Sequence, residues 1–222
     1  MSEQMQKQYF LDGEGDAWFE RNKENVDNDM SSWLESDYLT KLLMKIPLPQ
    51  GKEVTVVEVG CGQGLRLSYL NQERNWKTIG IDPSSQSIEY IKDKGSEGYI
   101  ATADNLPLKD KSVDLLIYGF CLYVCDIDDL FRIASEAHRV LKKSSWLAIL
   151  DFWLPHHKVN NYKHLEGVKS YKGDIPAMFD WHPSYVITNH TVRHHEDGRY
   201  TDEKDEWVGV TLIRRHDKME NP

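Results

Sequence analysis

Apolar runs recur along the middle of the chain and alternate with segments of helical periodicity. The runs predict strands at residues 54–60 (VTVVEVG), 76–82 (WKTIGID), 98–102 (GYIAT), 112–120 (SVDLLIYGF) and 145–152 (SWLAILDF). Helices are predicted between them, at 65–71, 84–94 and 127–141. Strands that are apolar throughout are typical of a parallel sheet buried on both faces. This alternation predicts an α/β fold of right-handed βαβ units, with helices on both faces of the sheet.

The two ends of the chain depart from this alternation. A helix is predicted from Ser32, with a Ser32–Glu35 capping box, up to Pro47. Trp18 and Phe19 interrupt a polar segment before it, so we expect residues 1–50 to form a helical arm or lid. That arm belongs to the same domain as residues 51–222. Near the other end, two strand-like runs flank Asp197 and Gly198 and predict an antiparallel hairpin, YVITNHTVR (185–193) and EWVGVTLIRR (206–215).

Composition fits one compact domain and narrows the possible partners. The 222 residues are 40% hydrophobic and carry a formal net charge of -9, which makes nucleic acid an improbable partner and a small molecule the expected one. The N-terminus lacks the apolar core of a secretory signal, and no apolar stretch is long enough to span a membrane, so a cytoplasmic protein is expected. Three cysteines match no zinc or disulfide framework, and monomer and homodimer stay equally open.

Chemistry-bearing residues follow three of the predicted strands. Gly60, Gly62 and Gly64 lie between a strand and a helix, where they allow a sharp turn and the close approach of a ligand. A dinucleotide-binding loop has a glycine where this chain has Leu65. Asp82 ends the second strand, where a carboxylate can accept both hydroxyls of a ribose. After the third strand, the turn Asp104–Leu106 offers a carboxylate for an adenine amino group and an apolar side chain for the ring.

Residues 54–151 resemble the class I S-adenosylmethionine-dependent methyltransferases through VVEVGCGQG, GIDPS, ATADNLPLKDKSVDLLIYGF and HRVLKKSSWLAILDF, in that order. The resemblance implies a Rossmann-like, seven-stranded, mostly parallel sheet with a C-terminal antiparallel hairpin, and S-adenosyl-L-methionine as cofactor. One departure is Lys143-Ser144-Ser145, where the family usually has Pro-Gly-Gly. The cofactor-binding residues that it implies are Glu58, Gly60, Cys61, Gly62, Gly64, Asp82, Pro83, Asp104, Asn105, Leu106 and Phe120.

A hydroxyl acceptor also requires that a proton be removed, which directs attention to the histidines. His156 and His157 follow the fifth strand and are the first candidates for a general base; His182 is the second. Tyr123, just past the fourth strand, is a candidate to hydrogen-bond the acceptor. His194 and His195 are assigned to a solvated turn, and no residue pair has the spacing of metal ligands.

The local distribution of charge gives an indication of the acceptor's chemistry. Lys158, Lys163, Lys169 and Lys172 gather within an otherwise acidic chain, which favours an anionic acceptor or, equally, a solvated lid. A looser resemblance of residues 156–185 to methyltransferases of bacterial sugar and surface-glycan pathways favours a carbohydrate hydroxyl. The alternatives are an RNA-modifying methyltransferase, a nicotinamide-dependent oxidoreductase and a non-catalytic cofactor-binding partner subunit.

Overall fold

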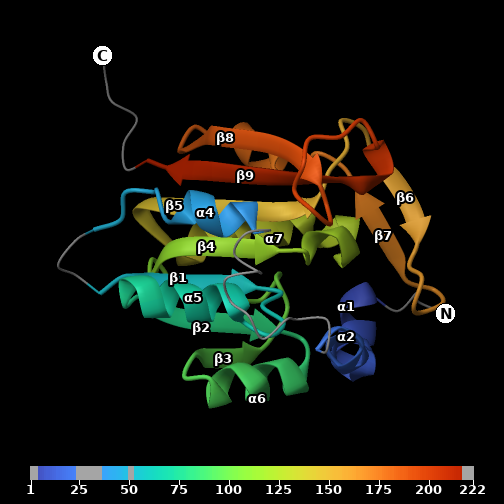
Figure 1. The fold of residues 1–222 in the computed structure, drawn as a ribbon, viewed down its shortest axis with the longest axis horizontal. Coiled ribbons are helices and arrows are strands. Elements are labelled where there is room, and N and C mark those ends of the chain that lie inside the picture. Colours follow the sequence, from blue (N-terminus) through green and yellow to red (C-terminus); the bar gives the residue numbers. More distant parts are fainter. Residues whose placement is uncertain (1–4, 24–36, 50–52, 217–222) are drawn as a thin grey trace.

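A seven-stranded sheet forms the centre of the protein (Figure 1). The computed structural model describes residues 5–23, 37–49 and 53–216. The strands lie in the order β3-β2-β1-β4-β5-β9-β8, and the first five are mutually parallel. Their bounds are β1 Thr55–Val59, β2 Lys77–Asp82, β3 Glu97–Ile100, β4 Val113–Gly119, β5 Leu141–Phe152, β8 Tyr185–His194 and β9 Trp207–Arg215. The predicted Rossmann-like sheet is thereby confirmed.

Two layers of helices bury the faces of this sheet. Apolar side chains of α4 (Tyr38–Leu43), α5 (Leu65–Arg74) and α6 (Ser85–Asp93) pack in one cluster against one face. Those of α7 (Leu130–Val140) and α8 (Ala177–Asp180) pack in a second cluster on the other. Because both faces are covered, the central strands are mostly apolar, and all seven residues of β4 are buried.

The C-terminal hairpin completes the sheet as expected. β9 runs antiparallel to both of its neighbours, β5 and β8, so it is the one antiparallel strand of the seven described. Gly198 adopts the left-handed conformation, with φ 67°, in the connection after β8. The hairpin lies beside β5 although more than thirty residues separate the two strands in sequence (Figure 1).

Several predicted bounds differ from the structure. β5 begins at Leu141 rather than at 145, because Ser144 takes a left-handed backbone (φ 55°) that lets the Lys-Ser-Ser turn run within the strand. Of the helix predicted between Ser32 and Pro47, the structure describes α4, which is capped by Asp37. Ser32 and Glu35 lie outside the described residues. The polar stretch after β5 contains a small hairpin, β6 (Lys158–Asn161) and β7 (Lys169–Lys172).

The N-terminal segment is helical and lies across the loops at the carboxyl ends of the parallel strands (Figure 1). It consists of α1 (Gln6–Tyr9), a π-helical turn (Phe10–Glu14) and α2 (Gly15–Asn22). Across residues 5–23, 37–49 and 53–216, no helix has both the length and the apolar character needed to cross a bilayer.

Candidate functional site

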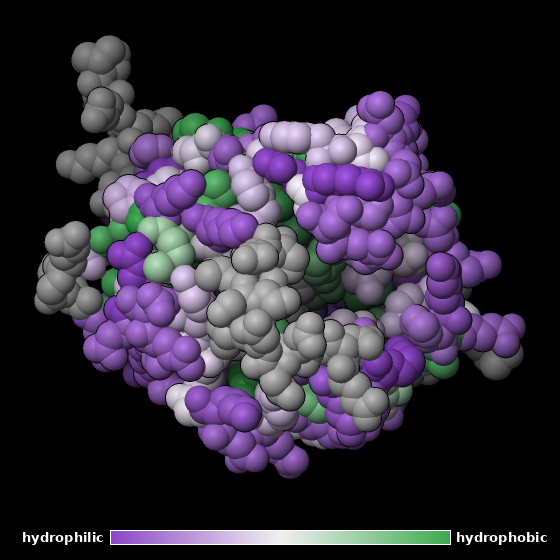
Figure 2. Space-filling model, in the orientation of Figure 1, coloured by the Kyte–Doolittle hydropathy of each residue, from purple (hydrophilic) through white to green (hydrophobic). Residues whose placement is uncertain are grey.

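A cavity of about 440 Å³ opens at the carboxyl ends of the parallel strands. On the hydrophilic face shown in Figure 2, a hollow lies on the side toward which β1, β2 and β4 run. The loops after β1, β2, β3 and β4 all contribute to the lining, as α/β sheets arrange their ligand sites. The candidates that line it are Glu58, Gly60, Cys61, Gly62, Gly64, Asp82, Pro83, Asp104, Phe120 and Tyr123.

The glycine turn after β1 needs its glycines for their backbone conformation. Gly60, Gly62 and Gly64 all have positive φ, at 72°, 49° and 64°. A Cβ at Gly60 would lie 2.6 Å from Cys121 Cβ, so the turn also packs closely on the loop after β4. Side chains at these positions would be strained and would fill the cavity edge, which explains the alternating glycine pattern.

Asp82 connects the end of β2 with that glycine turn. Its Oδ2 accepts the Gly62 N–H at 3.0 Å and its Oδ1 accepts the Ser84 N–H at 2.9 Å. Burial raises the pKa of Asp82 to about 6, although the two backbone donors oppose that rise. Each carboxylate oxygen keeps a further lone pair, so the group can still accept two hydroxyls of a ligand in the cavity.

A buried charge network lies behind the turn. Arg66, on α5, donates to Asp37 at 2.9 Å through one guanidinium nitrogen and to Glu58 through another. Burial raises the pKa of Glu58 to about 7, while Arg66 opposes the rise. Glu58 and Arg66 both line the cavity, so this pair fixes a polar floor next to the glycine turn.

The turn after β3 is arranged differently from the sequence expectation. Asp104 lines the cavity, but its Oδ2 accepts a hydrogen bond from Lys7 Nζ at 2.5 Å. This contact holds the pKa of the Asp104 carboxyl below its usual range. Asn105 is exposed, and Leu106 is buried in the core, so neither lines the cavity. The structure places Ala101 there instead. The adenine role of Asp104 stays a prediction.

The N-terminal segment packs closely on the site. Asp16 accepts hydrogen bonds from the Ser84 hydroxyl at 2.7 Å and from the Gln86 backbone N–H at 3.1 Å. The Trp18 ring lies over Gly62, where a Cβ would be 3.3 Å from the ring. Phe10, Gly15 and Trp18 all line the cavity. The segment thus supplies part of the cavity wall, and its role as a lid stays a prediction.

Gly15→Val is expected to weaken binding of S-adenosylhomocysteine about tenfold. Gly15 meets the chain after β2 so closely that a Cβ would lie 3.0 Å from Ser84 N. A valine side chain would force the N-terminal segment away from the cavity. Isothermal calorimetry measures the change, with Glu20→Val, at an exposed position of α2, as the control. Equal affinity in Gly15→Val and wild type would show that the segment does not close the site.

Of the four catalytic candidates, the structure brings only Tyr123 to the cavity. His156 and His157 are exposed outside the lining, because the chain turns away from the sheet edge after β5. His182 lies near the opposite end of the sheet, where its ring contacts those of His138 and Tyr185 at 5.0 and 5.4 Å. Burial raises the pKa of Tyr123, so its phenol stays protonated and serves as a donor.

The sequence analysis missed several lining residues. Phe152 ends β5, and His195, assigned to a solvated turn, follows β8, yet their rings lie 5.5 Å apart and both line the cavity. Lys7 reaches the site from the N-terminal segment. Asp151, on β5, accepts the backbone N–H groups of Leu122 and Tyr123 at 2.8 and 3.2 Å. No local pattern marks these contacts, since each joins distant parts of the chain.

Comparison with known proteins identifies a family model that matches the central part of this chain. The model of a family described as a methyltransferase domain matches residues 57–149. Malonyl-[acyl-carrier protein] O-methyltransferase of Marinomonas sp. is 32% identical over 116 residues, 49% of this chain and 41% of that protein. 2-Phytyl-1,4-naphtoquinone methyltransferase of Nostoc sp. is 31% identical over 118 residues, 48% of each chain. The matches span less than half the length of these relatives.

Solved structures share the fold. The 1,6-didemethyltoxoflavin-N1-methyltransferase of Burkholderia thailandensis, with bound 1,6-didemethyltoxoflavin and S-adenosylhomocysteine, has a TM-score of 0.66 at 13% identity, over 95% of this chain and 87% of that one. A chain from the complex between the Haloferax volcanii Trm112 methyltransferase activator and the putative methyltransferase also scores 0.66 at 16% identity, over 93% and 97%.

The cavity residues fit an adenosine-containing cofactor. The glycine turn leaves no side chain at the edge next to Asp82, and the buried Asp82 carboxylate faces the cavity with lone pairs to spare. S-Adenosylmethionine is the cofactor of the matched family. Seven strands in this order, a glycine turn after β1 and the acid that ends β2 agree with the family match, and we conclude that residues 57–149 form a methyltransferase domain of the class I, S-adenosylmethionine-dependent type.

Proposed function

We propose that this protein transfers a methyl group from S-adenosylmethionine to a hydroxyl oxygen of a small molecule. The observation that carries the proposal is one cavity that joins the glycine turn and Asp82 to a ring-lined region at Phe120, Tyr123 and Phe152. The first region suits a nucleoside and the second a small acceptor. Two of the proteins named above, the 2-phytyl-1,4-naphtoquinone methyltransferase and the 1,6-didemethyltoxoflavin-N1-methyltransferase, act on small molecules according to their names, which supports the same class here.

In this proposal the chain's residues orient the two reactants. Asp82 accepts the ribose hydroxyls, and the turn at Gly60 and Gly62 allows the methionine portion to approach the backbone. Asp104 accepts the adenine amino group once Lys7 shifts toward Asp129, its other partner at 2.9 Å. The cofactor supplies a methyl group that is already activated by a positively charged sulfur, so orientation accounts for most of the catalysis.

An anionic or carbohydrate-like acceptor has weaker support from charge. The expected cationic cluster lies largely on β6 and β7, where Lys158 pairs with Asp205 and Lys172 donates to the Asp205 backbone. The cations that line the cavity, Lys7 and Arg66, are each paired with two carboxylates. An anion would therefore have to compete with existing ion pairs, so we base the proposal on a neutral hydroxyl group.

An RNA-modifying function is the second candidate. It is favoured by 24% identity over 107 residues to the 18S rRNA (guanine-N(7))-methyltransferase of Mus musculus and by the fold shared with the Trm112 complex. The net charge of -9 opposes it, because RNA affinity depends on cationic contacts. RNA binding that weakens as salt increases would support it.

The proposed function is tested in two steps. Calorimetry with S-adenosylmethionine and S-adenosylhomocysteine should show saturable, micromolar binding; an absence of binding to either would contradict the proposal. A methyl-transfer screen then uses phenols, sugar nucleotides and phosphorylated metabolites, and records S-adenosylhomocysteine released. Turnover with RNA but with none of the small molecules would favour the second candidate.

A further inference from the structure

Three aromatic rings form a wall at one end of the cavity, where β4 and β5 end. The rings of Phe120 and Phe152 are 5.6 Å apart and those of Tyr123 and Phe152 are 5.1 Å apart. All three are half-buried and line the cavity. Tilted and edge-on rings of this kind attract a further aromatic ring beyond what their apolar area alone provides. This wall of Phe120, Tyr123 and Phe152 is therefore suited to a planar aromatic group.

The backbone holds this wall in a fixed position. Phe120 has φ 51°, a left-handed conformation that is rare for an aromatic residue and is maintained only where the surroundings impose it. Its N–H donates to the Leu150 carbonyl at 2.8 Å. Asp151 holds the next turn through the N–H of Tyr123 at 3.2 Å. The rings are thus ordered before any acceptor arrives.

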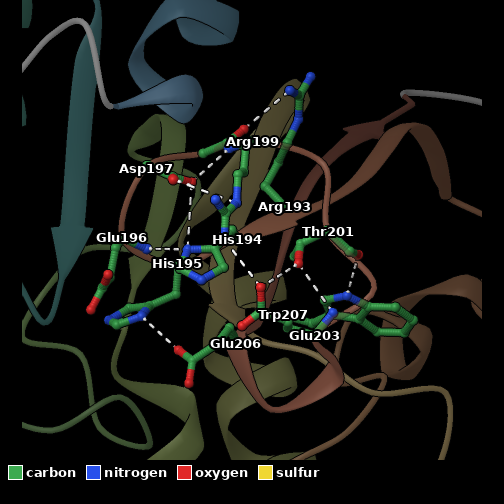
Figure 3. A network of polar contacts seen from close by, with 11 residues as sticks. Arg193, His194, His195, Glu196, Asp197, Arg199, Thr201, Glu203, Glu206 and Trp207 are labelled. Atoms are coloured by element: carbon green, nitrogen blue, oxygen red, sulfur yellow. Dashed lines mark hydrogen bonds and ion pairs between the residues drawn. The ribbon is translucent and has the colours of Figure 1, made fainter.

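A histidine and a carboxylate meet at the edge of the wall. His195 lines the cavity, and its ring lies 5.5 Å from that of Phe152 and 6.5 Å from that of Phe120. Its Nδ1 is 3.2 Å from Glu206 Oε2, and its backbone N–H donates to the Glu206 carbonyl at 2.9 Å. Figure 3 shows the imidazole and the Glu206 carboxylate directed toward one another across the end of the hairpin.

The contact with Glu206 determines which imidazole nitrogen is available. A carboxylate at Nδ1 accepts a hydrogen bond from the Nδ1–H group and so favours the tautomer with Nε2 unprotonated. Within the described part of the chain, no hydrogen bond occupies Nε2. A histidine held in this way has the arrangement of a general base and its orienting group. Glu206 does not line the cavity and acts on an acceptor only through His195, so it is a positioning residue.

We propose that the methyl acceptor is a phenol-type hydroxyl, that its ring packs on the wall of Phe120, Tyr123 and Phe152, and that His195 accepts its proton. This inference rests on the proposed function. The phenol O–H proton moves to Nε2, the oxygen forms a bond to the methyl carbon, and the C–S bond breaks with its electron pair kept by sulfur. The proton then passes from His195 to solvent. The products are the methyl ether and S-adenosylhomocysteine.

The test uses 4-nitrophenol with the S-adenosylhomocysteine complex, at a pH where free 4-nitrophenol is mostly protonated. Its phenolate absorbs visible light, so the spectrum reports proton transfer without turnover. We expect saturable binding accompanied by phenolate absorbance. Phe152→Leu should weaken binding about tenfold through loss of ring contact, and His195→Asn should remove most of the phenolate signal. His216→Asn, an exposed histidine beyond β9, is the matched control.

Glu206→Gln separates positioning from simple packing. With ¹⁵N-labelled histidine, the nitrogen shifts of His195 should show a proton on Nδ1 in the wild-type protein and a mixture of tautomers in the variant. The phenolate signal should decrease in parallel. Unchanged tautomers in Glu206→Gln, an unchanged phenolate signal in His195→Asn, or no 4-nitrophenol binding to a complex that does hold S-adenosylhomocysteine would each overturn this inference alone. Failure to bind S-adenosylhomocysteine would overturn the proposed function as well.

Discussion

Asp82→Ala is expected to weaken binding of S-adenosylhomocysteine at least about 100-fold. Two ribose hydrogen bonds to a carboxylate would be lost, each contributing roughly 1.5–3 kcal/mol. The variant also leaves the N–H groups of Gly62 and Ser84 without the acceptor that now fixes the glycine turn. Calorimetry measures the loss, with Asp93→Ala, an exposed acid at the end of α6, as the control.

The same carboxylate gives the binding a pH dependence. Burial raises the pKa of Asp82 to about 6, so protonation removes a charged acceptor as the pH falls through that value. We expect affinity for S-adenosylhomocysteine to decrease between about pH 7 and pH 5. Asp82→Asn, which cannot titrate, should bind more weakly than wild type at neutral pH and respond less to pH. Wild-type affinity in Asp82→Ala would show that the cofactor lies elsewhere.

Arg66→Leu is expected to lower the free energy of unfolding by about 3–5 kcal/mol. Arg66 is the cation between Asp37 and Glu58, all three being buried, and its removal leaves two carboxylates without a counter-charge. Urea denaturation measures the change in free energy. Arg74→Leu, on the exposed side of the same helix, should change it by less than about 1 kcal/mol.

The pH dependence of this loss identifies its cause. Glu58 has a pKa raised to about 7 in the folded protein, above its ordinary value of 4.5, so its ionisation lowers stability as the pH rises between those two values. Without Arg66 the carboxylate is harder still to ionise, and the loss should be larger at about pH 8 than at about pH 5. Adding Glu58→Gln should recover part of it. A loss independent of pH would point to altered packing instead.

The part of the cavity that we propose binds the cofactor was predictable from the sequence because its signals are local. Gly60, Gly62 and Gly64 are required by the backbone conformation of one turn. Asp82 ends an apolar run that is recognisable as a strand from its own residues. Parallel strands bring such ends to one edge of a sheet whatever the details of packing. Asn105 and Leu106 were misplaced because the side-chain directions after β3 depend on how that turn packs against α7.

The ring-lined part of the cavity, which we propose binds the acceptor, was not predictable in the same way. His156 and His157 follow β5 directly, and sequence proximity favoured them, but the chain leaves the sheet there and exposes both. His195 is 43 residues beyond Phe152 and reaches it only because β9 inserts between β5 and β8 and brings the end of the hairpin to the cavity. The local sequence pattern around His195 does not predict this long-range contact.

The amino-acid sequence alone indicated the methyltransferase domain, the strand–helix alternation and the residues that form the glycine turn and its partnering acid. These depend on periodicity and backbone conformation, which neighbouring residues decide. Only the tertiary structure decided that Lys7 lines the cavity and that His195 meets Glu206 beside three aromatic rings. Those contacts join segments distant in sequence, and their geometry arises only when the sheet, the hairpin and the N-terminal helices pack together.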